Sequence, residues 1–257
     1  MTATHPEAPA YRSAGARPEG AASEREAAAR VREMFGGIAP RYDLLNHVLS
    51  LNLDRAWRRR VARRFSNVLA RADARVLDLC CGTGDLTLAL ARRGPARVIG
   101  SDFAHPMLLS ARRKSGAGAG AAANYVEADA LHLPFADGTF DLVTAAFGFR
   151  NLGNYDCGLR EIHRVLKPGG QVGILEFAEP KSALFGSLYR FYFTRMLPVI
   201  GGMISGSRAA YTYLPASVGK FPSPEELAAR MSAAGFVKPS CELWTGGSVA
   251  LHSATKQ

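Results

Sequence analysis

Carboxylates that follow short apolar segments are the groups of this chain best suited to bind a ligand. Asp78 lies near the end of one such segment, Asp102 ends a second, and Asp129 ends a third. The turn Gly82-Thr83-Gly84 follows the first segment, and a helical pattern begins at Asp85. A strand, a glycine turn and a helix form the layout of a nucleotide-binding crevice at the carboxyl end of a first strand.

Two features of this turn select the ligand. Thr87 stands where the dinucleotide motif has its third glycine, and Asp85 at the helix start would repel a pyrophosphate. A ligand with an adenosine, no phosphate and cationic groups is attracted instead, and S-adenosylmethionine is such a ligand. A plain strand–helix turn is the alternative interpretation of the glycines alone.

The other two acids support a cofactor site. Asp102 follows the turn by about twenty residues, where a carboxylate hydrogen-bonds the ribose hydroxyls in an open α/β sheet. Asp129 is placed to accept a hydrogen bond from the adenine amine. Each acid alone fits a helix cap equally well, and three strand-end acids around one glycine turn favour the cofactor site.

Length and composition limit the class of protein. The chain has 257 residues, 47% of them hydrophobic, which suffices for one α/β domain with a buried core and appended helices. Its four cysteines form no C-x-x-C pair, so we expect reduced cysteines and no metal site. The net charge of +10 is compatible with nucleic acid or an anionic membrane and does not choose between them.

The elements that must position these residues follow from the pattern of the chain. Residues 1–22 predict a disordered tail, and 23–257 predict a single domain that begins with a helical cap over 23–70. In the cap, Gly36-Gly37 predicts a helix break, and the run Arg58–Arg60 fits either a cover over the crevice or a solvated basic face. Strands are expected at 75–79, 97–102, 124–128, 140–146, 171–177, 236–243 and 247–254.

An aromatic and apolar segment, 184–204, lies within an insertion at 180–215. It fits either a buried helix pair or an apolar substrate channel that touches a membrane through Arg190, Arg195 and Arg208. We favour the channel, because soluble cores seldom need so many aromatic residues outside the sheet.

Motifs spread from about Arg32 to the C-terminus carry a family resemblance. They are Tyr42–Asn46 with Ser50 and Trp57, Leu77–Asp85, Phe147–Asn151, Arg164–Gly170 through Glu176, Tyr211–Leu214, Phe221-Pro222, Ala234–Phe236 and Ala250–His252. In these motifs the sequence resembles the family of ubiquinone and menaquinone biosynthesis C-methyltransferases. Leu45, Asp54 and Ala178 depart from the family pattern, which has Met, His and Ser at these positions.

The resemblance implies a fold and a set of cofactor contacts. The fold is α/β, that of a Rossmann-like class I S-adenosylmethionine-dependent methyltransferase, with a seven-stranded, mostly parallel sheet, flanking helices, an N-terminal helical cap and an aromatic helical insertion before the last strands. Carried over by position, the contacts to S-adenosylmethionine are Thr83, Asp102, Asp129 and Ala130, to which the loop pattern adds Asp78, Gly82 and Gly84.

The resemblance also implies C-methylation of a polyprenyl quinol. A ring carbon that attacks the methyl group must be electron-rich, so the ring is expected in its reduced form with one hydroxyl at least partly deprotonated. Arg150 and Asn151 follow the fourth strand and are expected to stabilise the developing phenolate. Tyr42 or Asp43 is expected to take the proton, ahead of His163.

The substrate within that class has alternatives. The pair Cys80-Cys81 and the stretch Tyr192–Gly202 are closer to the menaquinone branch, so we expect methylation of demethylmenaquinol, with a polyprenyl benzoquinol of ubiquinone biosynthesis as the alternative. A non-catalytic cofactor-binding scaffold of a quinone-biosynthesis complex stays open because of Asp54 and Ala178. Nucleic acid is not expected, since no added binding module or stacking platform is recognisable.

The polyprenyl tail of such a substrate resides in a membrane. No signal peptide is recognisable, and no apolar run reaches the roughly eighteen residues that a membrane span needs. We therefore expect a cytoplasmic protein that contacts the anionic inner face of the membrane peripherally. A homodimer is left open.

Overall fold

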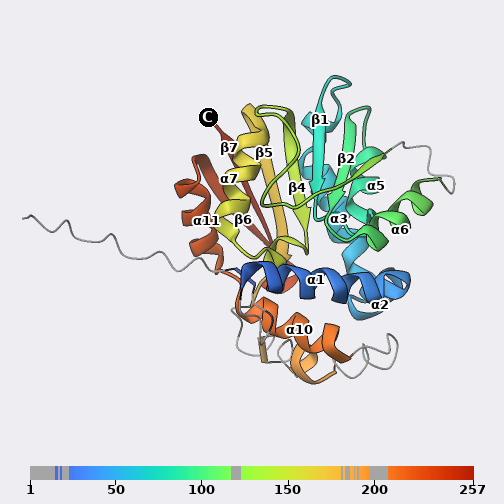
Figure 1. Ribbon diagram of the computed structural model, residues 1–257. Coiled ribbons are helices and arrows are strands. Elements are labelled where there is room, and N and C mark those ends of the chain that lie inside the picture. The colour runs from blue at the N-terminus through green and yellow to red at the C-terminus, as the bar shows by residue number, and fades with distance from the viewer. Residues whose placement is uncertain are drawn as a thin grey trace, which may run out of the picture.

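The computed structural model pairs seven strands into one sheet in the order β3-β2-β1-β4-β5-β7-β6 (Figure 1). The strands are β1 (Arg75–Leu79), β2 (Arg97–Asp102), β3 (Asn124–Glu127), β4 (Phe140–Ala146), β5 (Leu166–Phe177), β6 (Phe236–Trp244) and β7 (Val249–Lys256). β7 runs antiparallel to β5 and β6, and the other pairs are parallel. The expected seven-stranded, mostly parallel sheet is confirmed. The structure describes residues 15–16, 18, 23–116, 123–180, 182, 186–187, 189, 191–196 and 208–257.

Helices cover both faces of this sheet (Figure 1). α7 (Tyr155–Val165) and α11 (Pro224–Ala233) share one apolar core with Leu77 and Leu79 of β1. On the opposite face, α3 (Leu53–Arg64), α4 (Ser66–Leu69) and α5 (Asp85–Ala91) share a second core with Val76. Neighbouring residues of one strand thus enter different cores, because side chains alternate between the faces of a sheet.

A helical layer lies across one end of the sheet (Figure 1). It consists of α1 (Glu24–Ile38), α2 (Tyr42–Leu49) and α10 (Arg208–Gly219), with α6 (His105–Gly116) beside it. Buried side chains of these helices, including Leu45, Met107 and Val218, form a third core. The layer covers the carboxyl ends of the strands, where ligands bind in open α/β sheets.

The predicted helix break at Gly36-Gly37 is wrong, because α1 continues through both glycines to Ile38. Ser23 caps its start by accepting a hydrogen bond from the Glu26 backbone N–H at 3.1 Å. A Cβ atom on Gly36 would lie 3.5 Å from Pro106 of α6, so α1 packs close against its neighbour at this position. Packing of this kind outweighs the low intrinsic helix propensity of glycine.

Two expectations concern segments that the structure describes only in part. Within the predicted tail, Ala16 is buried and donates its backbone N–H to the Leu152 carbonyl at 2.9 Å, so this position departs from the expected disorder. Of the aromatic segment 184–204, residues 186–187, 189 and 191–196 are described, while Arg190 and the rest lie outside the described residues. Among the helices that the structure describes, none has the length and apolarity to cross a membrane.

Candidate active site

A cavity opens at the point where the strand order reverses, between β1 and β4. Its lining comes from the chain directly after these strands, Leu79–Thr83 and Ala146–Gly148, and from Ala28 and Phe35 of α1 above them. The predicted loop residues Asp78, Gly82 and Thr83 line it, as do Asp102, Asp129 and Ala130. Six of the seven expected cofactor residues therefore surround one cavity, which we call the cofactor cavity, and Gly84 is not part of its lining.

Asp102 is fixed at its edge by backbone donors. Its Oδ2 accepts the Gly82 N–H at 2.8 Å and its Oδ1 accepts the Ala104 N–H at 2.9 Å. Burial raises the pKa of Asp102 above its ordinary value, while these backbone donors stabilise the carboxylate. A carboxylate accepts about four hydrogen bonds, so Asp102 keeps capacity for ribose hydroxyls.

Asp78 lies deeper, beneath the loop. It accepts hydrogen bonds from the hydroxyl groups of Thr87 at 2.6 Å and Thr144 at 2.9 Å, which join β1, β4 and α5. Burial raises its pKa to about 6, although both hydroxyls oppose the shift. Asp129, by contrast, is exposed at the rim of the cavity.

Two glycines allow the loops beside the cofactor cavity to pack closely against neighbouring residues. Gly84 has φ of 83°, and a Cβ atom there would lie 2.7 Å from the Tyr125 hydroxyl. A Cβ atom on Gly148 would lie 2.4 Å from the Cβ atom of Cys80, so only glycine fits where the two loops meet. Burial raises the pKa values of the Cys80 and Cys81 thiols well above the ordinary value, so both remain protonated.

Asp43 of α2 is hydrogen-bonded to the cofactor loop. It accepts a hydrogen bond from the Thr83 hydroxyl and lies 2.7 Å from the Lys114 ammonium. Lys114 also donates to Thr83 and, at 2.6 Å, to Asp85. This network ties α2 and α6 to the loop, and Asp43 itself lines neither cavity of the site.

A second cavity, of about 470 Å³, adjoins the first, and we call it the apolar cavity. Trp57, Phe147 and Phe177 form an aromatic wall, with ring centroids 4.7 to 6.5 Å apart. Residues of α1, α2, α3, α10 and the described part of the aromatic segment complete its lining. Phe35, Tyr42, Arg58 and Phe147 line both cavities, which therefore meet at these side chains.

Arg150 lines the apolar cavity and is buried. Its Nη1 donates to Glu176 Oε2 at 2.9 Å and to the Phe147 carbonyl. Burial opposes its charge, and the Glu176 carboxylate more than offsets that cost, so the pKa of Arg150 lies above its ordinary value. Its buried Nε has no hydrogen-bond partner among the described residues. Asn151 lines the cofactor cavity, and its Oδ1 accepts the Tyr213 hydroxyl at 3.1 Å.

The remaining candidates for the proton acceptor differ in position. Tyr42 lies where the two cavities meet, and burial raises its pKa, so its phenol is neutral at pH 7. His163 packs edge-on against Phe236, with ring centroids 5.1 Å apart, and lines neither cavity.

The sequence left open whether the arginines at 58–60 cover the crevice or face solvent, and the structure places Arg58 in the site. It is buried, whereas Arg59 and Arg60 are exposed. It pairs with Asp54 one helical turn earlier, and its Nη1 lies 3.6 Å from Asp85 Oδ2. Spacing of four residues between an acid and an arginine, beside the buried Trp57, is the signal that distinguishes Arg58 from its neighbours.

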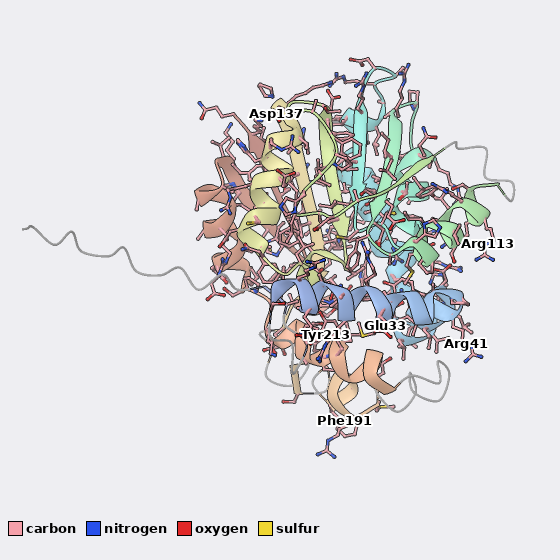
Figure 2. All side chains as sticks on the ribbon, in the orientation of Figure 1. Glu33, Arg41, Arg113, Asp137, Phe191 and Tyr213 are labelled. Atoms are coloured by element: carbon pink, nitrogen blue, oxygen red, sulfur yellow. The ribbon has the colours of Figure 1, made fainter. Side chains whose placement is uncertain are left out.

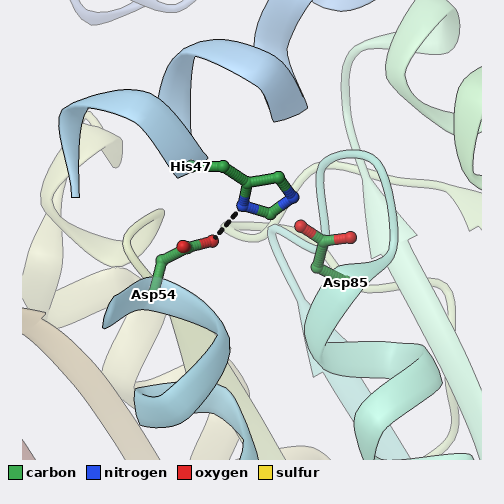
Figure 3. A group of neighbouring side chains, drawn as sticks. All are labelled: His47, Asp54 and Asp85. Atoms are coloured by element: carbon green, nitrogen blue, oxygen red, sulfur yellow. Dashed lines mark hydrogen bonds and ion pairs between the residues drawn. The ribbon is translucent and has the colours of Figure 1, made fainter. Parts of the chain in front are cut away.

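His47, Asp54 and Asp85 bring possible metal-binding atoms within 4.8 Å of one another (Figure 3). His47 Nδ1 lies 2.9 Å from Asp54 Oδ2, the contact dashed in Figure 3. The guanidinium of Arg58 already stands between the two carboxylates and compensates their charge. Burial raises the pKa of Asp54, but Arg58, the Ser50 hydroxyl and His47 together lower it more. The pKa of Asp54 therefore lies below its ordinary value.

The sheet order, the cavity at its switch point and the acids around it define a class I S-adenosylmethionine-dependent methyltransferase fold. Solved structures agree. A possible histamine N-methyltransferase of Thermotoga maritima aligns with a TM-score of 0.59 at 17% identity, over 88% of this chain and 99% of that one. A phosphoethanolamine N-methyltransferase of Haemonchus contortus aligns with a TM-score of 0.60 at 16% identity, over 92% and 60%.

Sequence comparison identifies the family. Residues 23–256 match the ubiE/COQ5 methyltransferase family, and the chain belongs to it. A demethylmenaquinone methyltransferase of Thermus thermophilus is 54% identical over 85% of this chain and 98% of that protein, and one of Deinococcus radiodurans is 53% identical over 80% and 84%. A ubiquinone/menaquinone biosynthesis C-methyltransferase of Geotalea daltonii is 46% identical over 80% and 88%. The family resemblance is confirmed.

Proposed function

We propose that this protein transfers a methyl group from S-adenosylmethionine to a ring carbon of a demethylated polyprenyl quinol. The observation that carries the proposal is the position of Arg150, which lines an apolar cavity that meets the cofactor cavity. Its buried Nε has no hydrogen-bond partner among the described residues. A guanidinium in that position is a preorganised donor for an oxygen that gains negative charge.

The cofactor cavity suits S-adenosylmethionine by charge. Four carboxylates line it, those of Asp78, Asp85, Asp102 and Asp129, and Arg58 is the single cationic side chain that the described residues contribute. We assign Asp102 to the ribose hydroxyls and Asp129 and Ala130 to the adenine. Arg58 then receives the carboxylate of the methionine moiety, and Asp85, whose buried Oδ2 has no hydrogen-bond donor among the described residues, receives its ammonium.

When bound, S-adenosylmethionine supplies a methyl group whose C–S bond breaks as the ring carbon forms the new C–C bond. The aromatic wall of Trp57, Phe147 and Phe177 holds the quinol ring beside the junction of the two cavities. Arg150 stabilises the negative charge of the ring oxygen. Tyr42, as a neutral phenol, donates a hydrogen bond there, and Asn151 offers its amide N–H groups. Asp43 positions the cofactor loop through Thr83.

The ring proton that methylation releases needs an acceptor. Of the described residues that line the apolar cavity, Asp54 is the one carboxylate, and it is bonded to His47, which is partly exposed. A ring carbon that has gained the methyl group is strongly acidic because its deprotonation restores aromaticity, so a carboxylate with a low pKa suffices. We propose that Asp54 accepts the ring proton and that the proton then passes through His47 to solvent.

Within this class, demethylmenaquinol is the proposed substrate. The Thermus and Deinococcus relatives are named for demethylmenaquinone, and they share more identity with this chain than the Geotalea relative named for both quinones. A polyprenyl benzoquinol remains the second substrate to test. The polyprenyl tail keeps either quinol in a bilayer, so the proposal includes peripheral contact of a cytoplasmic protein with an anionic membrane.

The test is methyl transfer from labelled S-adenosylmethionine to chemically reduced demethylmenaquinol, beside a demethylated benzoquinol, with the products identified by mass. Labelling of the naphthoquinol alone supports the proposal. Labelling of both quinols extends the substrate class. Labelling of neither, while calorimetry still shows S-adenosylmethionine binding, contradicts the proposed substrate and favours the scaffold.

A further inference from the structure

Exposed apolar side chains concentrate at the corner between α2 and α3. Of the eight large hydrophobic residues exposed among the described residues, Leu44, Val48, Leu51 and Leu53 lie within ten consecutive positions. Leu51 is 78% exposed, and both it and Asn52 have positive φ, of 52° and 60°. Single exposed leucines need no explanation, but a cluster of four marks an interaction surface. We call these four residues the apolar corner.

The apolar corner is continuous with the mouth of the apolar cavity. Leu51 and Leu53 both face solvent and line the cavity. Phe191 and Met196 of the aromatic segment do the same, and Figure 2 shows Phe191 at the outer end of the molecule, away from the sheet. A cavity of about 470 Å³ is of the size that holds a drug-sized ligand, so a long polyprenyl tail must leave through this mouth.

Basic side chains follow the apolar corner along α3. A groove of about 450 Å³ between α3 and α5 is lined by alanines and by four arginines, Arg59, Arg63, Arg92 and Arg93. In the described part of the chain none of these four pairs with a carboxylate, and no acid lines the groove. We call it the arginine groove. An apolar surface beside unpaired arginines is complementary to a bilayer with anionic headgroups.

We propose that the apolar corner is the surface by which this protein docks on an anionic lipid bilayer, with the arginine groove facing the headgroups and the cavity mouth opening toward the hydrocarbon. This placement rests on the proposed function, because it lets the quinol ring enter while its tail remains in the lipid. A second copy is a poorer occupant, since a two-fold contact through the corner brings the arginine grooves of both copies together.

The first experiment tests the apolar contact with the full chain and vesicles. The variant Leu44→Gln/Val48→Gln changes two exposed corner residues that do not line either cavity, and Leu109→Gln/Leu243→Gln changes two exposed leucines elsewhere. In co-sedimentation with phosphatidylglycerol–phosphatidylcholine vesicles, the corner variant should bind about tenfold more weakly than the unmodified chain. The control variant should bind as the unmodified chain does. Equal binding by both variants would overturn the proposal.

The second experiment tests the charge. Arg59→Gln/Arg63→Gln removes two arginines of the groove, and Arg75→Gln/Arg97→Gln removes two exposed arginines at the amino ends of β1 and β2. The groove variant should lose about tenfold in affinity for the same vesicles, and the control should lose much less. If both variants lose affinity alike, net charge rather than this surface directs binding, and the proposal fails.

Turnover separates docking from chemistry. The corner variant should methylate a short-tailed, water-soluble quinol at the rate of the unmodified chain and lose activity on a long-tailed quinol in vesicles. Loss on both quinols overturns the docking role. If the unmodified chain methylates neither quinol, the proposed function fails, while vesicle binding still decides the docking surface. Light scattering completes the test. If the unmodified chain is a dimer and the corner variant is a monomer, a second copy covers the corner and the proposal fails.

Discussion

The side chains of Arg150 and Glu176 form an ion pair closed off from solvent, with Nη1 2.9 Å from Oε2 and Glu176 0% exposed. The other carboxylate oxygen of Glu176 accepts the backbone N–H of Arg150 at 3.0 Å. Glu176 thus holds both the backbone and the guanidinium of Arg150. The carboxylate fixes Nη1 and with it the orientation of the buried Nε, which has no partner among the described residues. The Arg150 side chain lines the apolar cavity and not the cofactor cavity.

This arrangement predicts a loss in turnover without a loss in cofactor affinity. Arg150→Lys retains a charge for Glu176 and removes the Nε donor, so kcat should fall by about a hundredfold. The dissociation constant for S-adenosylmethionine, measured by calorimetry, should stay within about twofold. Because an unpaired Glu176 is costly, the charge-free pair Arg150→Met/Glu176→Gln serves as the control for stability. Equal losses in kcat and cofactor affinity would show that Arg150 maintains the cofactor site instead.

Arg58 should discriminate between cofactor analogues. If its guanidinium receives the carboxylate of the methionine moiety, the unmodified chain should bind S-adenosylmethionine about tenfold or more tightly than decarboxylated S-adenosylmethionine. Arg58→Gln should weaken binding of the intact cofactor and remove this preference. Arg55→Gln, an exposed arginine of the same helix, should retain it. A preference that persists in Arg58→Gln would assign the carboxylate to another group.

The route for the proton predicts chemical rescue. His47→Ala removes the partly exposed acceptor beyond Asp54, so kcat should fall by about tenfold, and added imidazole should restore it. Cofactor affinity should not change, because His47 lines neither cavity. His105→Ala, which removes an exposed histidine of α6, should leave kcat unchanged with and without imidazole. An unchanged kcat in His47→Ala would exclude this route.

The strands and the cofactor loop were predictable because their signals are local. An apolar run, a strand-end acid and a glycine turn lie within one stretch of chain, and the structure places Asp78, Gly82 and Thr83 around one cavity accordingly. The break at Gly36-Gly37 was wrong because helix propensity is weak beside packing against Pro106, a residue distant in sequence.

The finer parts of the site depend on contacts between distant residues. Glu176 and Arg150 are 26 positions apart, and they meet because β4 and β5 are neighbours in the sheet. Of three successive arginines only Arg58 is buried, and the fold brings its Nη1 within 3.6 Å of Asp85, a residue distant in sequence. The apolar corner likewise depends on the turn at Leu51. The sequence does not predict this turn, because Leu51 has a positive φ at a position where the chain has no glycine.

His252 of β7 predicts the dependence of stability on pH. It is buried, its Nδ1 has no partner among the described residues, and burial lowers its pKa from 6.5 to about 4. The unfolded chain therefore binds a proton at higher pH than the folded chain does, so stability should be full above about pH 6.5 and decline as the pH falls toward 4. The contribution that is lost amounts to about 3 kcal/mol.

Urea unfolding at a series of pH values measures this contribution. In His252→Leu, the difference in unfolding free energy between pH 7 and pH 4 should be smaller than in the unmodified chain by about 3 kcal/mol. His132→Leu changes an exposed histidine and should leave the difference unchanged. If His252→Leu keeps the full pH dependence, other buried groups cause it. Asp78 is not among these groups, because its raised pKa favours the folded state at low pH and so acts in the opposite direction.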